Sequence, residues 1–242
     1  MRALSLALLL PLAACGTGSS AQETPGVAGT GSGTTRSYAV ADFVKVTQAG
    51  PDDVDVRVGS GFSVRAEGDE DALGKLRIAR DGDMLRIERT RGSGINWNGG
   101  RKVKVYVTMP RITAMSLAGA GDVSIDRVEG ASFSGEIAGA GNLTIGAMQV
   151  DAATLSIVGA GDLSVRGTAT ALKASTTGAG DIDASGLTAR RATIDTTGAG
   201  NVTAMVDGEA EVSIMGAGDV DLGPKAKCTV SKMGPGSVRC GK

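Results

Sequence analysis

Asp and Asn residues recur at nearly constant spacing in the C-terminal half of the chain, at Asp122, Asn142, Asp162, Asp181, Asn201 and Asp219. Carboxylate and carbonyl oxygens are calcium ligands, and the adjacent carboxylates Asp162 and Asp181 are the weak calcium candidates in this series. The alternative is that each side chain caps a chain corner by accepting a hydrogen bond from a backbone N–H of its own turn. We favour capping, because calcium-binding β-rolls use a nonapeptide repeat that this chain lacks. We therefore expect no metal and no other cofactor.

Catalysis and nucleic-acid binding are disfavoured by composition. The chain has no histidine, which removes Ser-His-Asp and Cys-His chemistry. Paired carboxylates could still hydrolyse glycosidic bonds, but the Asp residues are spread evenly and the 242-residue chain has only three Phe, two Tyr and one Trp to stack on sugars. Lys and Arg total 25 against 26 Asp and Glu, so no cationic field exists to hold a phosphate backbone. We expect a protein that is not an enzyme and does not bind nucleic acid.

Each of these Asp and Asn residues closes a Gly-Ala-Gly motif, and the motifs follow one another at intervals of about 18 to 20 residues. A degenerate copy follows at Gly234-Pro235-Gly236-Ser237. Glycine suits a sharp corner, where the backbone needs positive φ or close approach. The repeat corners are Gly119, Gly121 and Asp122; Gly139, Gly141 and Asn142; Gly159, Gly161 and Asp162; Gly178, Gly180 and Asp181; Gly198, Gly200 and Asn201; and Gly216, Gly218 and Asp219.

The residues that flank each corner alternate between apolar and polar, as in Leu117, Val123 and Ile125 around the first corner. Alternation with a period of two predicts strands with one buried face. Identical residues at equivalent positions are most simply stacked in register, one coil above the next. The sequence therefore predicts an all-β fold, a single-stranded parallel β-helix of about seven coils, right-handed by analogy, over residues 111–242. Each coil would hold two strands around the corner and a looser return through segments such as 127–131.

Residues 37–110 form a β-rich N-terminal region with clear alternation at 54–58, 76–78, 85–87 and 103–107, and weaker alternation at 43–47 and 62–67. The region is either a small antiparallel sheet that caps the rod or its first, wider coils, and we favour continuity. Trp97, in a glycine-rich loop, and Tyr106 are candidate contacts for a glycan or protein partner. The alternative for these two residues is partial packing against the fold.

The N-terminus reads as an export signal. Residues 1–14 combine one basic residue, an apolar run and small residues, and they end before Cys15 in Leu12-Ala13-Ala14-Cys15, which resembles a bacterial lipobox. We expect cleavage before Cys15, lipid modification of that residue, and a flexible Gly/Ser/Thr linker over 15–36. Ordinary secretion with a free Cys15 is the alternative. The lipid would anchor the protein to the bacterial cell envelope, at the outer membrane or the periplasmic face.

Two further cysteines, Cys228 and Cys240, lie near the C-terminus. In an exported protein, such a pair favours a disulfide over two free thiols. The alternative is that Cys240 is a small buried apolar residue in the last turn.

The strand Val105-Tyr106-Val107-Thr108-Met109-Pro110, followed by Leu117-Ala118-Gly119-Ala120-Gly121-Asp122-Val123 and the repeated corners, resembles the auto-transporter adhesin "head GIN" domain family over about residues 38–238. The resemblance implies a bacterial exported lipoprotein with an all-β, helix-like stack and an adhesin role, and it supplies no catalytic residues. We expect a non-catalytic lipoprotein that acts in surface adhesion or cell-envelope interaction. The alternatives are a structural or sensory envelope lipoprotein without an adhesive role and, less favoured, a glycan-active β-helix enzyme.

Overall fold

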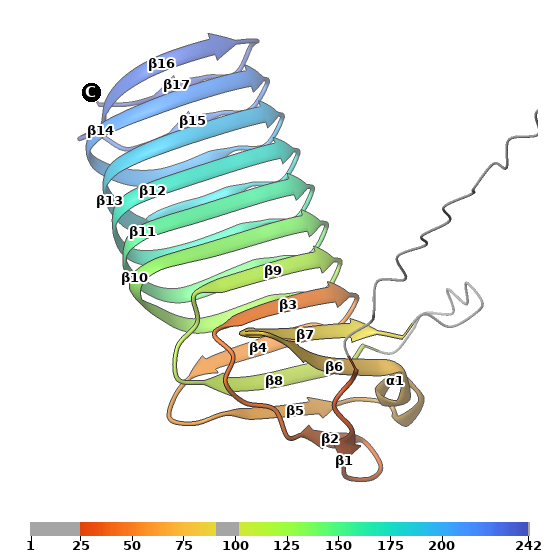
Figure 1. Ribbon diagram of the computed structural model, residues 1–242. Helices are drawn as coiled ribbons and strands as arrows, with labels where there is room; N and C mark the ends of the chain where they lie inside the picture. The colour runs from red at the N-terminus through yellow and green to blue at the C-terminus, as the bar shows by residue number, and fades with distance from the viewer. Residues whose placement is uncertain (1–24, 91–101, 242) are drawn as a thin grey trace, which may run out of the picture.

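The computed structural model describes residues 25–90 and 102–241, and almost all of its regular structure is β-strand (Figure 1). One helix, α1, spans Glu70–Lys75. The strands are β1 Gly29–Thr30, β2 Thr35–Tyr38, β3 Lys45–Gly50, β4 Asp53–Val58, β5 Ser63–Glu67, β6 Leu76–Asp81, β7 Met84–Arg89, β8 Lys104–Met109, β9 Ala114–Gly119, β10 Val123–Gly139, β11 Leu143–Gly159, β12 Leu163–Gly178, β13 Ile182–Gly198, β14 Val202–Gly216, β15 Val220–Asp221, β16 Lys227–Met233 and β17 Val238–Arg239.

Strands β10 to β14 stack in parallel and in register, which confirms the predicted parallel β-helix. Val123 pairs with Leu143, and Leu143 pairs with Leu163, so equivalent repeat positions lie directly above one another. The solenoid has about six turns rather than seven. The count is lower because the corner at Gly234 leads into β17, which pairs for two residues with β15 and begins a turn without closing it.

The return segments within β10 to β14 are also strand, so the prediction of a looser return was wrong for these coils. In the last described coil, residues 222–226 between β15 and β16 are not strand. Arg127 pairs with Ala147 and Gly130 pairs with Val150, which continues the ladder through the segment expected to be irregular. Because the neighbouring coil offers a partner to each backbone group, the chain satisfies its hydrogen bonds by bending a strand rather than by leaving the sheet. Figure 1 shows these long strands curving around the rod.

The corners approach so closely that side chains cannot enter them. Gly119 has φ of 143°, and a Cβ built on it would lie 2.3 Å from the carbonyl oxygen of Gly50. At Gly121 a Cβ would lie 1.9 Å from the carbonyl oxygen of Asp52. Positive φ at the first glycine and close backbone contact at both glycines together explain why these corner positions are glycine.

The same contacts reveal a corner that lacks the Gly-Ala-Gly motif. Gly50 pairs with Gly119, and β3 and β4 stack below β9 and β10 as a further coil of the solenoid. This corner reads Gly50-Pro51-Asp52-Asp53, and it precedes the first Gly-Ala-Gly corner by 69 residues. The intervening chain forms the layers beneath it.

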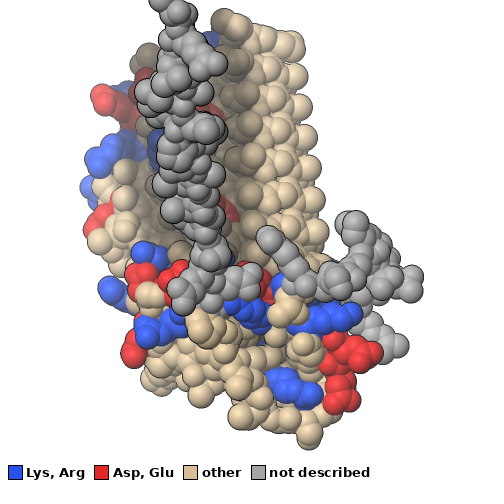
Figure 2. All heavy atoms as spheres, turned by 45° about the vertical axis from the view of Figure 1, so that its right-hand side comes forward, with Lys and Arg blue, Asp and Glu red and all other residues tan. Residues whose placement is uncertain are grey.

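Below that coil the pairing changes from parallel to antiparallel. Strands β7 and β8 still run parallel to β3 and β4. Strands β6 and β5 then pair antiparallel with β7 and β8, and β2 and β1 follow in antiparallel order. Helix α1, capped by Asp69, connects β5 to β6. Figure 2 shows charged side chains gathered over these N-terminal layers, while one long side of the rod above them is uncharged in that view.

One inward-facing file of side chains runs through the whole rod just before the corners. Its members are Gln48, Leu117, Ile137, Ile157, Thr176, Thr196, Ile214 and Lys232. Three of the polar members, Gln48, Thr176 and Lys232, each donate a hydrogen bond to the carbonyl four residues ahead, at 2.8 to 2.9 Å. Lys232 belongs to the last coil and is exposed. For the buried Gln48 and Thr176, the corner carbonyl is the local acceptor that lets a polar residue occupy an otherwise apolar core.

Candidate functional site

The Asp and Asn residues at the corners form a hydrogen-bonded ladder along the rod. The Oδ1 of Asp122 accepts from the backbone N–H of Asn142 at 3.3 Å and from the Asn142 side-chain amide at 2.9 Å. The same acceptor position serves the next coil at each step, through Asn142, Asp162, Asp181, Asn201 and Asp219 to Ser237. Asp53 begins the series by accepting from the backbone N–H of Asp122 at 3.0 Å.

This ladder corrects the expected capping geometry. Each side chain bonds the corner of the following coil rather than its own turn, so its role is to join coils. The Oδ1 of Asp162 accepts from the backbone N–H of Asp181 at 3.0 Å, which commits one oxygen of the calcium candidate pair to the ladder. Among the described residues, no group of three or more His, Cys, Asp or Glu side chains is placed to hold a metal ion.

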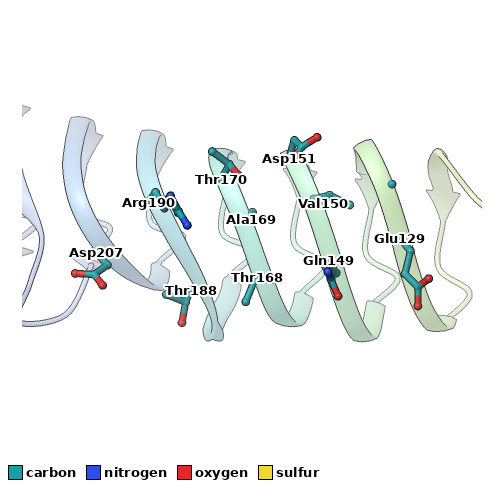
Figure 3. Close-up of a pocket in the computed structure, with 11 residues that line it drawn as sticks. Glu129, Gln149, Val150, Asp151, Thr168, Ala169, Thr170, Thr188, Arg190 and Asp207 are labelled. Carbon is teal, nitrogen blue, oxygen red and sulfur yellow. The ribbon is translucent and has the colours of Figure 1, made fainter.

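The candidate binding site is a groove of about 700 Å³ that crosses the return segments of β10 to β14 (Figure 3). We call it the side groove. It is lined by Glu129, Gly130, Gln149, Val150, Asp151, Thr168, Ala169, Thr170, Thr188, Arg190 and Asp207. The groove combines a narrow floor with two polar walls, and both features follow from strand alternation.

The floor is a file of small or apolar residues that point inward. Gly130, Val150 and Ala169 pair with one another across successive coils, and Val150 and Ala169 are buried. Because their side chains are short, the surface is hollow here.

The walls are the residues on either side of the floor in each strand. Glu129, Gln149, Thr168 and Thr188 stack in one wall. Asp151, Thr170 and Arg190 form the other, as Figure 3 shows. Coils repeat at about 4.8 Å, so each step along the groove offers a new set of hydrogen-bond donors and acceptors. Such a surface suits an extended polymer with regularly spaced polar groups.

The charged residues of the groove do not form a concentrated field. Glu129, Asp151 and Asp207 come from three different strands, and Arg190 lies among them. Asp207 is paired with Lys225, with 3.3 Å between the carboxylate Oδ2 and Nζ. Hydroxyl, amide and well-spread charged groups favour binding through hydrogen bonds over binding through net charge.

The residues singled out in the sequence do not gather at the groove. Tyr106 lies on β8, where the cationic groups of Arg65 and Lys104 sit 4.9 and 5.3 Å from its ring centroid. Trp97 and Cys15 fall outside the described residues. Cys228 and Cys240 form a disulfide that ties β16 to the residue after β17. Sequence reasoning missed the groove because no wall residue recurs in every coil as the corner glycines do, and one wall consists of Glu129, Gln149, Thr168 and Thr188. The signal in the sequence was the file of small residues in the return segments.

Arg89 and Asp219 are two of the charged groups whose pKa values are shifted by a clear local cause. Hydrogen bonding to the carboxylate of Asp52 raises the pKa of the Arg89 guanidinium above its usual range. The side chain and backbone of Ser237 both donate to Asp219 at 2.8 Å, and these hydrogen bonds lower the pKa of that carboxyl. The two groups lie at opposite ends of the stack of corners. Arg89 contacts Asp52 of the first corner, and Asp219 contacts Ser237 of the last.

Solved structures of similar shape support the same fold. A protein from Bacteroides fragilis described as a "putative adhesin" superposes with a TM-score of 0.76 at 22% identity, over 85% of this chain and 95% of that one. A "putative lipid binding protein" from Parabacteroides distasonis gives 0.68 at 20% identity, over 87% and 97%. A "putative adhesin" from Parabacteroides merdae gives 0.68 at 17% identity, over 87% and 97%. No curated protein matches the chain.

Within the described residues, no helix has the length and apolar character needed to cross a membrane. The family model described as "Putative auto-transporter adhesin, head GIN domain" matches residues 42–225, which include strands β3 to β15, the corner ladder from Asp53 to Asp219 and the side groove. The chain therefore belongs to the head GIN domain family of auto-transporter-type adhesins.

Proposed function

We propose that this protein is an exported lipoprotein that binds an extended, hydroxyl-rich polymer of a cell surface, a glycan, in the side groove without cleaving it. The observation that carries the proposal is the groove itself, which presents polar side chains from five successive coils on either side of a small-residue floor. A polymer can meet a matching set of groups at each step, so many weak hydrogen bonds add up along its length. The family's adhesin description agrees with a binding role.

The polar walls favour a hydrated polymer over an acyl chain as the main occupant. One structural neighbour is described as a "putative lipid binding protein". In this chain, however, Gln149, Thr168 and Thr188 would be left without partners beneath a hydrocarbon chain. The proposed lipid is the covalent anchor at Cys15. The expected linker of residues 15–36 ends earlier than predicted, because Gly29–Thr30 and Thr35–Tyr38 are strands of the folded body.

The test is a binding screen of the purified folded region against glycans and cell-envelope components, with one groove variant and one matched control. Thr168→Trp places a large ring in the groove. Thr197→Trp places the same ring at another exposed threonine in a strand, away from the groove. We expect a bound glycan to be lost with Thr168→Trp and retained with Thr197→Trp. Binding unaffected by Thr168→Trp, or no binding at all, would overturn the proposal, and release of product would indicate a glycan-active enzyme.

The anchoring part has its own measurement. A mass spectrum of the protein isolated from its native membrane should show a chain that begins at Cys15 and carries acyl groups. A Cys15→Ser variant should be found in the soluble fraction. An unacylated Cys15 in the native protein would contradict the lipoprotein assignment while leaving the groove untouched.

A further inference from the structure

A change in coil length alters the surface at one end of the side groove. Ala184 of β13 pairs with Ala204 of β14, but the next pair joins Thr188 to Met205. Strand β14 therefore has no counterpart for the three residues between Ala184 and Thr188. Met205 and Val206, which follow this change in register, line a pocket beside the side groove.

The shortening leaves a small pocket of about 230 Å³, which we call the apolar side pocket. Its lining is Thr188, Met205, Val206, Asp207, Leu222, Pro224 and Lys225. Thr188 and Asp207 also line the side groove, so the two spaces are continuous. Met205 is 42% exposed, which is unusual for a large apolar side chain and leaves its thioether accessible to a ligand.

The chemistry of the pocket differs from that of the groove beside it. Met205, Val206, Leu222 and Pro224 supply apolar surface, whereas the groove walls are polar. The Asp207–Lys225 ion pair stands at the boundary between them, with 3.3 Å between its charged atoms. At about 230 Å³, the pocket is smaller than the sites that hold whole drug-sized ligands, so it fits a substituent rather than a separate molecule.

We propose that the apolar side pocket binds the acyl substituent of a sugar in the side groove, and that the preferred ligand therefore belongs to the acetamido-sugar class. This inference rests on the proposed function. The methyl of an acetamido group would exchange water for contact with the exposed apolar surface of Met205 and Pro224, whereas a hydroxyl at the same position of the sugar would gain no apolar contact there. The pocket would thus select among polymers that the groove alone would accept.

The direct test uses the protein labelled with ¹³C at its methionine methyl groups, with the Met205 signal assigned from a Met205→Leu variant. The probes are N,N′-diacetylchitobiose and cellobiose, which share a linkage and differ at the acetamido position. We expect the Met205 methyl signal to shift on addition of the acetylated disaccharide and to stay in place with cellobiose. No shift with the acetylated probe, or equal shifts with both probes, would overturn the inference.

A variant pair gives the energetic readout with longer oligosaccharides of the same two types. Met205→Gln keeps the side-chain length but makes the pocket polar, and Met215→Gln makes the same change at an exposed methionine outside the groove. We expect Met205→Gln to weaken binding of the acetylated chain about tenfold, the lower end of what a small apolar group contributes in a fitted pocket. Met215→Gln should have no effect. If Thr168→Trp abolishes binding but Met205→Gln does not weaken it, the acyl assignment fails while the groove proposal stands; if Thr168→Trp has no effect, the groove proposal fails.

Discussion

Two guanidinium nitrogens of Arg89 donate hydrogen bonds to the buried carboxylate of Asp52, at 2.8 Å from Nε to Oδ2 and 2.5 Å from Nη2 to Oδ1. Asp52 stands where the Gly-Ala-Gly corners carry their second glycine, directly beneath Gly121. A side chain is tolerated there because the layer below presents the ends of β7 and β8 instead of another stacked corner. The Asp52 carboxylate contacts the ends of both strands. It binds Arg89 at the end of β7, and its Oδ1 accepts a hydrogen bond from the backbone N–H of Val103, the residue before β8, at 2.9 Å.

Asp52→Ala should therefore lower the free energy of unfolding substantially. The substitution removes the carboxylate that binds two nitrogens of the partly buried Arg89 guanidinium and the acceptor of the Val103 N–H, and removing one partner of a buried ion pair costs up to about 3–5 kcal/mol. The control is Lys45→Ala, which breaks the exposed pair with Asp83 and should cost about 0–1 kcal/mol. Urea denaturation of both variants measures the difference, and equal losses would contradict a special role for Asp52.

Thr176 and Thr196 occupy equivalent core positions on neighbouring coils but should respond in opposite ways to replacement by valine. The Thr176 hydroxyl donates to the Gly180 carbonyl at 2.9 Å, whereas the Thr196 hydroxyl is buried without a partner. Thr176→Val should lower the free energy of unfolding by about 1 kcal/mol. Thr196→Val should leave it unchanged or raise it, because an unsatisfied buried hydroxyl is removed at constant shape. Denaturation curves that show equal losses would refute this distinction.

Much of the solenoid can be predicted because its requirements repeat. Leu117 and Ile137 are both apolar because they share one buried file. The corners are glycine because a Cβ there would collide with the backbone of the neighbouring corner. The corner at Gly50 was not predicted, because Pro51 and Asp52 replace the Ala and the second Gly of the motif and because 69 residues separate it from the next copy. The side groove was not predicted for a different reason. Its wall residues need only be polar, so the fold does not require the same residue at equivalent positions of successive coils.

The alternation of Asp and Asn along the corner ladder limits charge repulsion, and Asn142 tests this point. Its amide donates to Asp122 while its Oδ1 accepts from the backbone N–H of Asp162. Asn142→Asp would replace the donor with a carboxylate and create an unbroken run of carboxylates from Asp53 to Asp181, so stability should fall by up to about 1 kcal/mol. Added salt should recover part of the loss, since exposed charges are screened. A loss that does not change with salt would point to packing instead of charge.

Ser237 should control the titration of Asp219. Two hydrogen bonds from Ser237 hold the pKa of Asp219 below the ordinary range of a carboxyl. The ionised carboxylate therefore stabilises the corner fully at pH values above the ordinary pKa, and this stabilisation is lost as the pH falls through the lowered pKa. Ser237→Ala removes the hydroxyl and should move the pKa of Asp219 upward. Carboxyl ¹³C titration by NMR measures it directly. Ser231→Ala, on the exposed face of β16, is the control and should leave the titration of Asp219 unchanged.

The Cys228–Cys240 disulfide should hold the last coil in place without affecting the rest of the rod. The ladder partners of β16 in the described chain all lie on β14, and Val230, whose equivalent Val212 is 1% exposed one coil below, is 46% exposed. This coil therefore lacks the packing that secures the others. The two cysteines are 12 residues apart in the sequence, and a disulfide that closes a loop of this size contributes about 3 kcal/mol by lowering the entropy of the unfolded state.

In a stack where each repeat contacts its nearest neighbours, losing that contribution should stay local. A Cys228→Ser/Cys240→Ser variant should lose amide hydrogen-exchange protection in β16 and β17, while β10 to β12 keep theirs. Reduction of the native protein should produce the same pattern. Because the ladder bond from Ser237 to Asp219 would remain, the corner should be the last part of this coil to open. Loss of protection that spread evenly to β10 would show instead that the rod unfolds as one unit.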